Sequence, residues 1–413
     1  MHDPSSALTT AGAERPRYEV ADVVRAYGAE FLRTHETLPA QRQVLRAIAR
    51  CRTPVLGGHV EGCDACGHKR IAYNSCWNRH CPKCQGAARA KWMATEQAML
   101  LPVDYFHVVF TLPHALNALI PVNPRELYAL LFRAAAATLL AFARDAKYLG
   151  GEPGITMVLH TWGQNLTEHA HVHCVVTGGG LSLDHSRRIS VWRRRRRRPF
   201  LFPVKALSRM FRGKYLAALA RIHRRGQLQF TGQCGGLAES ERWHSFLATL
   251  QHTPWVVYAK RPFGGPERVL KYLSRYTHRV AISNRRLLFV GDGIVRFVWK
   301  DYADHTTHKE MTLAATEFLR RFLLHVVPRG FMRIRHYGIL ANRQREQKLP
   351  RCRELLSAAA LKASDAPSEA CDTDSRTEAL DDNDTERPLA PCPLCGAPMR
   401  IIEVLAPRPH DSS

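Results

Sequence analysis

Three histidines that alternate with small or apolar residues constrain this chain more than any other stretch. They are His169, His171 and His173, in a run that ends at Gly180. Such alternation is typical of a β-strand, and the glycines are typical of its end. Side chains two apart on a strand share a face, so we expect three imidazoles on one face and Val172 on the other. Two neighbouring imidazoles can hold a cation, although a histidine-rich, half-buried strand would show the same pattern.

A later segment carries two tyrosines at helical spacing. Apolar residues recur at helical spacing from Glu267 to Arg279, after Pro266, which predicts a helix with Tyr272 and Tyr276 on one face. Basic side chains surround them, namely Lys271, Arg275, His278 and Arg279. Most tyrosines at this spacing are core residues, but these neighbours favour a phosphate-binding surface.

The amino-terminal part contains two Cys-x-x-Cys motifs with fourteen residues between them. We predict a structural zinc site from the thiolates of Cys63, Cys66, Cys81 and Cys84. Other side chains close by can replace a thiolate or complete a second site, namely His59, His68, Cys76 and His80. A third motif, Cys392 to Cys395, is half a zinc site, and a metal there needs Cys352, Cys371 or a partner chain.

Charge and composition indicate a globular protein with a polyanionic partner. The chain has 413 residues, 45% of them hydrophobic, and 60 Lys and Arg against 36 Asp and Glu, a net charge of +24. This excess favours nucleic acid as the partner. Arginines at 133 and 144 limit the most apolar run, residues 127–143, so we expect no membrane span. Without a secretory signal the protein is expected in the cytoplasm, where its twelve cysteines are reduced or bind zinc.

The pattern of elements predicts an α+β fold with a sheet covered by helices. We expect strands over residues 105–113, 154–160 and 255–258, helices over 124–147 and 204–223, and a hairpin around Gly291-Asp-Gly293. The predicted divisions are a disordered segment 1–16, a helical and zinc-binding DNA-recognition domain 17–100, a catalytic domain 101–345, an acidic linker 346–390 and a tail 391–413.

Six consecutive arginines follow the histidine strand. They begin with Arg193, Arg194, Arg195 and Arg196 and end at Arg198. A run of like charge is most often a solvated loop. Six arginines cannot pack together without an anion, so phosphate binding is an equally good interpretation.

The histidine strand and the tyrosine helix together resemble the HUH endonuclease superfamily, and within it the two-tyrosine transposases of rolling-circle insertion sequences. The resemblance covers residues 20–345. It includes the cysteine module and the segments His160-Thr-Trp-Gly-Gln-Asn165, Pro262-Phe-Gly-Gly-Pro266 and Arg279-Val-Ala-Ile-Ser-Asn284. It implies an antiparallel sheet with the histidines on a central strand, and a zinc-binding domain ahead of it.

The resemblance also implies a mechanism on single-stranded element ends and target DNA. His171 and His173 would hold Mg²⁺ or Mn²⁺, while Tyr272 and Tyr276 form 5′-phosphotyrosine links. Several side chains compete to be the third metal ligand, with His169 and Glu267 ahead of Gln164, His160 and His278. The implied setting is bacterial and nucleoid-associated, and a homo-oligomer is compatible with this chemistry.

Two alternatives stay open. A replication initiator or a conjugative relaxase shares the chemistry, but the chain has no Gly-x-x-x-x-Gly-Lys-Ser/Thr motif of a fused helicase. In a zinc-dependent DNA-binding regulator without catalysis, the histidines and tyrosines would be structural only.

Overall fold

The computed structural model describes residues 16–190, 201–260, 268–269, 272, 280–301, 304, 307–364 and 391–408. The side chains of residues 85–91, 188–190 and 359–364 lie outside this description. Residues 1–15 of the predicted disordered start and residues 365–390 of the predicted acidic linker lie outside this description. The disorder of both segments therefore stays a prediction.

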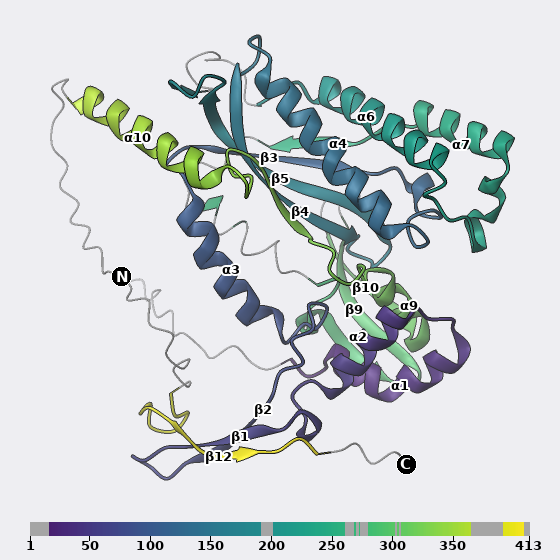
Figure 1. Cartoon of the computed structure of the whole chain (residues 1–413). Helices are drawn as coiled ribbons and strands as arrows, with labels where there is room; N and C mark the ends of the chain where they lie inside the picture. The colour runs from purple at the N-terminus through teal and green to yellow at the C-terminus, as the bar shows by residue number, and fades with distance from the viewer. Residues whose placement is uncertain are drawn as a thin grey trace, which may run out of the picture.

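An antiparallel sheet forms the centre of the molecule (Figure 1). Its order is β11-β4-β5-β3-β7, with β6 paired to β5. The strands are β3 (Tyr105–Thr111), β4 (Gly151–Trp162), β5 (Glu168–Ser182), β6 (Arg188–Ser190), β7 (Val257–Lys260) and β11 (Ile334–Gly338). The histidine strand β5 lies between β4 and β3, so the expected central position of the histidines is confirmed.

One face of this sheet is buried under helices. The covering helices are α4 (Pro124–Arg144), α6 (Val204–Arg224) and α7 (Ser240–His252). Phe110 of β3 packs edge-on against Phe211 of α6, and Val172 of β5 is fully buried in the same core. Burial of apolar area on this scale is the main force that holds the sheet to its helices. The histidines lie on the opposite face, which these three helices do not cover.

Helix α4 is long and apolar enough to cross a membrane by length and composition. In its most apolar 18-residue window, 67% is buried inside the protein. Its leucines and alanines pack in the core beneath the sheet, which accounts for their apolar character.

A second core lies below the sheet in Figure 1 and joins distant parts of the sequence. It contains α1 (Val20–Thr34), α2 (Pro39–Arg50), β8 (Leu287–Gly291), β9 (Ile294–Asp301), β10 (Thr307–Ala314) and α9 (Ala315–Leu324). The predicted hairpin is confirmed, because Asp292 and Gly293 both adopt positive φ between β8 and β9. Residues on both sides of the predicted boundary near 100 thus share one core.

A small three-stranded sheet of order β12-β1-β2 lies at the other end of the molecule. Its strands are β1 (Gly58–Gly62), β2 (Lys69–Tyr73) and β12 (Arg400–Leu405). The predicted tail therefore belongs to a folded unit with the amino-terminal hairpin. Helix α10 (Arg345–Ser364) occupies the start of the predicted linker, because Leu349 and Cys352 bury themselves against Ile339 and Leu340.

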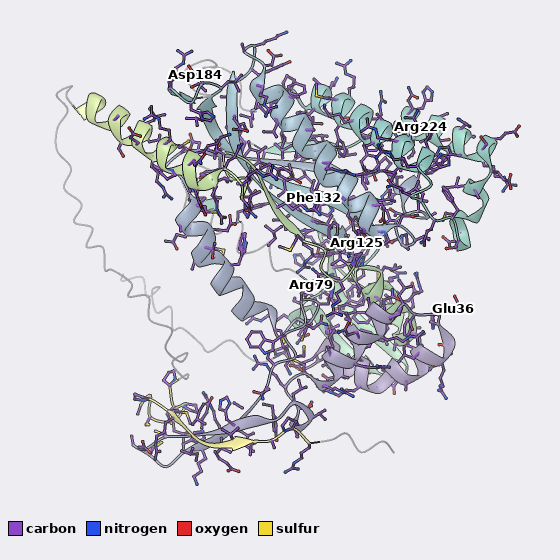
Figure 2. The ribbon with its side chains drawn as sticks, in the orientation of Figure 1. Glu36, Arg79, Arg125, Phe132, Asp184 and Arg224 are labelled. Atoms are coloured by element: carbon purple, nitrogen blue, oxygen red, sulfur yellow. The ribbon has the colours of Figure 1, made fainter. Side chains whose placement is uncertain are left out.

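Two arginines, Arg79 and Arg125, both bond to the loop between α9 and β11 (Figure 2). Arg79, near the cysteines, donates to the carbonyls of Pro328 and Phe331 at 2.7 and 2.6 Å. Arg125 of α4 donates to the Arg329 carbonyl at 2.8 Å. The guanidinium of Arg79 thus bonds to the backbone of this loop.

Candidate active site and metal centres

The open face of the sheet carries a group of three histidines. His160 lies opposite His171 in the β4–β5 register, and His173 follows two residues later on the same face. Ligand atoms of these three side chains all lie within 4.8 Å of one another, and the Nε2 atoms of His171 and His173 are 3.1 Å apart. Two imidazole nitrogens bound to one ion lie about 3 Å apart, so the spacing fits a shared cation.

Hydrogen bonding prepares His171 for metal binding. Its Nδ1 donates to the backbone carbonyl of His169 at 2.7 Å, which leaves the Nε2 lone pair directed toward His173. Burial lowers the pKa of His171 to about 4, so the imidazole is neutral at pH 7. A neutral imidazole with one nitrogen anchored is the usual form of a metal-bound histidine.

Among the described residues, His160 is the one of the five third-ligand candidates that joins this group. His169 lies on the same face, with its ring 4.9 Å from that of His171, but His160 joins the group in its place. The reason is the register, since His160 is directly opposite His171 and His169 is two residues beyond. Glu267 and His278 lie outside the described residues, and Gln164 lines the same cavity.

Tyr272 reaches this group from the open side of the sheet. Its hydroxyl oxygen lies 3.0 Å from Nδ1 of His173 and 2.6 Å from Nε2 of His107. The described part of its segment, residues 268, 269 and 272, is helical, as predicted, and Val269 anchors it by packing against Tyr105 and Val175. Tyr276, Lys271, Arg275 and Arg279 lie outside the described residues, as do Arg193, Arg194, Arg195 and Arg196.

Sequence reasoning missed His107. This residue lies on β3, opposite Val175 of β5 and Lys260 of β7, and it is 3% exposed. Burial lowers its pKa to about 3. A signal was available, because apolar residues occupy the alternate positions Phe106 to Phe110 of this strand and leave His107 on the histidine face.

A cavity of about 650 Å³ opens in front of these residues. Its wall combines the histidines and Tyr272 with Lys260 and the half-exposed Tyr258 from edge strand β7. It therefore offers a cation site, a phenol, a positive charge and an aromatic surface in one space, which are the groups that bind a phosphodiester and its bases.

The single zinc site predicted from Cys63, Cys66, Cys81 and Cys84 is not formed, because the two pairs belong to different groups. They lie at opposite ends of the β1–β2 hairpin, whose five-residue strands span roughly 16 Å. The first group contains Cys51, Cys76, Cys81 and Cys84, and the second contains Cys63, Cys66, Cys392 and Cys395. His80 is buried beside the first group but does not join it.

The first cysteine group lies inside the second core. Cys51 directly follows α2, and its Sγ is 3.4 Å from that of Cys84 and 3.6 Å from that of Cys81. Cys76, which the sequence offered as a replacement thiolate or as a ligand of a second site, has its Sγ 3.5 Å from Cys84. Cys51 was missed because it belongs to no Cys-x-x-Cys pair.

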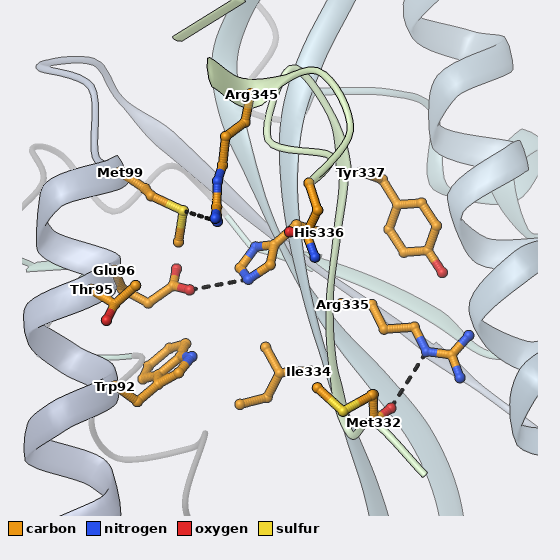
Figure 3. A pocket seen from close by; sticks show the side chains of 11 residues that line it. Trp92, Thr95, Glu96, Met99, Met332, Ile334, Arg335, His336, Tyr337 and Arg345 are labelled. Carbon is orange, nitrogen blue, oxygen red and sulfur yellow. Dashed lines mark hydrogen bonds and ion pairs between the residues drawn. The ribbon is translucent and has the colours of Figure 1, made fainter. Parts of the chain in front are cut away.

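A second cavity, of about 550 Å³, lies between α3 (Gln85–Met99) and β11 (Figure 3). Glu96 of α3 and His336 of β11 meet there at 3.2 Å. Burial raises the pKa of Glu96 to about 8, and burial together with Arg345 lowers the pKa of His336 to about 4. At pH 7 both groups are therefore neutral, so their close contact is not an ion pair.

Comparison with known proteins identifies the chain. Residues 23–112 match the family described as "Transposase zinc-binding domain", and residues 154–348 match that described as "Putative transposase". The chain is 52% identical over 380 residues to "Putative transposase y4qJ" of Sinorhizobium fredii, covering 91% of this chain and 92% of the relative. It is 30% identical over 326 residues to the transposase for insertion sequence element IS801 of Pseudomonas savastanoi pv. phaseolicola, covering 77% and 74%. No solved structure matches.

These relatives place the chain among transposases, a class of DNA-acting proteins. It belongs to the IS91/IS801 family of transposases. The expected combination of a transposase zinc-binding domain with a following transposase domain is thereby confirmed.

Proposed function

We propose that this transposase cleaves and rejoins single-stranded DNA by a tyrosine mechanism, as rolling-circle transposition requires. The hydroxyl oxygen of Tyr272 attacks a phosphodiester, the new bond is a 5′-phosphotyrosine, and the bond to the 3′ oxygen breaks to leave a free 3′-hydroxyl. The observation that carries the proposal is the 3.0 Å contact between the Tyr272 hydroxyl and His173, a member of the histidine group.

The histidine group fits a divalent cation. His160, His171 and His173 would hold it, and a bound cation supplies charge that stabilises the attacked phosphate and favours the phenolate. Imidazole ligands suit Mn²⁺ better than Mg²⁺, which prefers oxygen. Of the two metals that the superfamily resemblance implies, the donor set therefore favours Mn²⁺.

His107 is proposed to position the nucleophile. A free phenol has a pKa near ~10, whereas burial holds the pKa of His107 at about 3. This imidazole is therefore too weak a base to take the proton of the tyrosine. It can instead fix the hydroxyl by the 2.6 Å hydrogen bond, with the oxygen directed into the cavity. The proton of the phenol then has to leave through the DNA or solvent, and the 3′ oxygen takes one up when it departs.

Several groups are proposed to bind the DNA strand. Lys260 offers charge for a phosphate, and Tyr258, 52% exposed, offers a ring for a base. Lys271, Arg275, Arg279 and the arginines from Arg193 to Arg196 remain proposed phosphate ligands from the sequence. Tyr276 is the proposed second nucleophile, which joins the cut end to the target or to the second element end.

The first cysteine group is proposed to hold a structural Zn²⁺ within the transposase zinc-binding domain. Four thiolates fill a tetrahedral site and leave no position for chemistry. Trp77, 75% exposed beside this group, is a proposed aromatic contact to DNA. The setting we propose is the bacterial cytoplasm, on nucleoid DNA, as one chain or a homo-oligomer.

The test is covalent capture of DNA. Purified protein is incubated with end-labelled single-stranded DNA from the flanks of its gene, with Mn²⁺ or Mg²⁺, and analysed on a denaturing gel. We expect a protease-sensitive shifted band that decreases in Tyr272→Phe and disappears in the Tyr272→Phe/Tyr276→Phe variant. Tyr258→Phe, a tyrosine in the same cavity, is the matched control and should keep the band.

Binding of these DNAs without any adduct would contradict the proposal and favour the non-catalytic DNA-binding alternative. An adduct that survives in the double tyrosine variant would assign the chemistry to another residue. Either result separates this mechanism from a regulator that only recognises DNA.

A further inference from the structure

Two segments from opposite ends of the chain adopt the same turn. In Cys63–Gly67 the Gly67 amide donates to the Cys63 carbonyl, and the Cys63 amide donates to the carbonyl five residues on, both at 2.9 Å. In Cys392–Gly396 the same two bonds recur, at 2.9 and 2.8 Å. Gly67 and Gly396 both have φ near 70–75°, a conformation that favours glycine. The two Cys-x-x-Cys-Gly segments are therefore equivalent structural units.

Their four thiols converge on one point. The Sγ atoms of Cys63 and Cys395 are 3.4 Å apart, and those of Cys66 and Cys392 are 3.5 Å apart. Thiolates on one tetrahedral Zn²⁺ lie about 3.8 Å from one another, given Zn–S bonds of about 2.3 Å. A disulfide needs about 2.05 Å between its sulfurs. The observed spacing is close to that of a metal site and far from that of a disulfide.

The backbone holds the two segments in this position. Strand β12 pairs antiparallel with β1, from Gly58 opposite Leu405 to Gly62 opposite Arg400. Beneath the thiols, the buried apolar group contains only Cys63, Cys392 and Met399, with Ala397 packed against it. So small a core supplies little stability, and small domains of this kind usually depend on a metal.

We infer that Cys63, Cys66, Cys392 and Cys395 bind a second structural Zn²⁺, which fastens the carboxyl-terminal segment to the amino-terminal module. The match to the transposase zinc-binding domain spans residues 23–112 and contains only half of these ligands. The other half lies beyond both matched regions. With four thiolates the site has no open position, so its role is to shape this module. This inference does not depend on the tyrosine chemistry.

Zinc content of the full-length protein, purified under reducing conditions, tests the ligand set. The Cys392→Ser/Cys395→Ser variant should contain one zinc ion fewer per chain than the wild type, measured by mass spectrometry of the metal. The matched control is Cys234→Ser, a buried cysteine outside both groups, which should lose none. Equal zinc content in the wild type and the double variant would overturn the inference.

A second measurement on the native wild type avoids any effect of substitution on folding. Cys66 and Cys395 are exposed, so free thiols at these positions are accessible to iodoacetamide and would be alkylated without a chelator. Bound to zinc, they should resist alkylation and become reactive only after a chelator is added. Immediate reaction would contradict the inference. Protection that persists with the chelator and ends only with a reductant would show a disulfide instead.

Discussion

The histidine group and the second cysteine group are built over very different distances along the chain. The histidines come from β4 and β5, neighbouring strands within one antiparallel pair, and register alone brings them together. Cys63 and Cys395 are separated by 332 positions and meet because β12 pairs with β1. A site made by register can be inferred from two adjacent strands, whereas a site made by the two ends of a chain requires the whole topology.

The largest expected effect concerns which histidines act as ligands. His160→Ala and His171→Ala should each slow metal-dependent adduct formation by more than about 100-fold, since each removes a ligand. His169→Ala is the matched control, on the same face but outside the group, and should slow it by less than about tenfold. The measurement is the initial rate of covalent adduct formation with Mn²⁺ in excess.

Equal losses in His160→Ala and His169→Ala would show that register does not select the ligands. The histidine group would then not be a site that strand register alone assembles. A loss of adduct formation in His169→Ala but not in His160→Ala would make His169 the third ligand, as the sequence first favoured.

Much of the sheet could be predicted from the sequence, because each strand carries its own signal. Alternation identified β5 and placed its histidines on one face, as observed, and the buried run from Tyr105 identified β3. The third histidine of the group required the pairing of His160 with His171. No local pattern encodes that register, so proximity along the chain favoured His169 instead.

The cysteine groups show where such reasoning stops. Cys-x-x-Cys spacing found three pairs of cysteines whose members do lie together, but it joined the wrong two pairs, because sequence distance favoured Cys63 with Cys81. The β1–β2 hairpin holds these apart. Cys51 and Cys76 complete one group, and the carboxyl-terminal pair completes the other. Tertiary contacts, not spacing, decide which cysteine pairs come together.

The two cysteine groups should also differ in how much of the protein they stabilise. Cys51→Ser disrupts a group inside the core formed by α1, α2 and α9, so amide hydrogen exchange there should accelerate at least about tenfold. Cys395→Ser disrupts a group with a small core of its own, so acceleration should be confined to β1, β2 and β12. Exchange followed peptide by peptide measures both.

Acceleration of α1 in Cys395→Ser would contradict the separation of the two units. An unchanged α1 in Cys51→Ser would mean that the first group contributes nothing to the core around it. The exposed Glu346→Gln variant on α10 is the control for a substitution outside either group.

The smallest expected effect concerns the buried contact between α3 and the sheet. Helix α3 starts immediately after Cys84 and meets the sheet through Glu96 and His336. Burial raises the pKa of Glu96 to about 8, so the folded protein keeps a proton that the unfolded chain loses above pH 4.5. The unfolded state then binds fewer protons, and the free energy of unfolding must fall as the pH rises from about 4.5 to 8.

Unfolded histidines, with a pKa near ~6.5, contribute a slope of opposite sign that the wild type and the variants share, so the difference between them isolates Glu96, whose own contribution approaches about 1.4 kcal/mol per pH unit. Glu96→Gln keeps a neutral hydrogen-bonding side chain and should remove this slope between pH 6.5 and 8, while Glu346→Gln should preserve it. Urea unfolding across this range, followed by tryptophan fluorescence, gives the comparison. Identical slopes in Glu96→Gln and the wild type would mean that Glu96 carries no extra proton in the folded protein over this pH range.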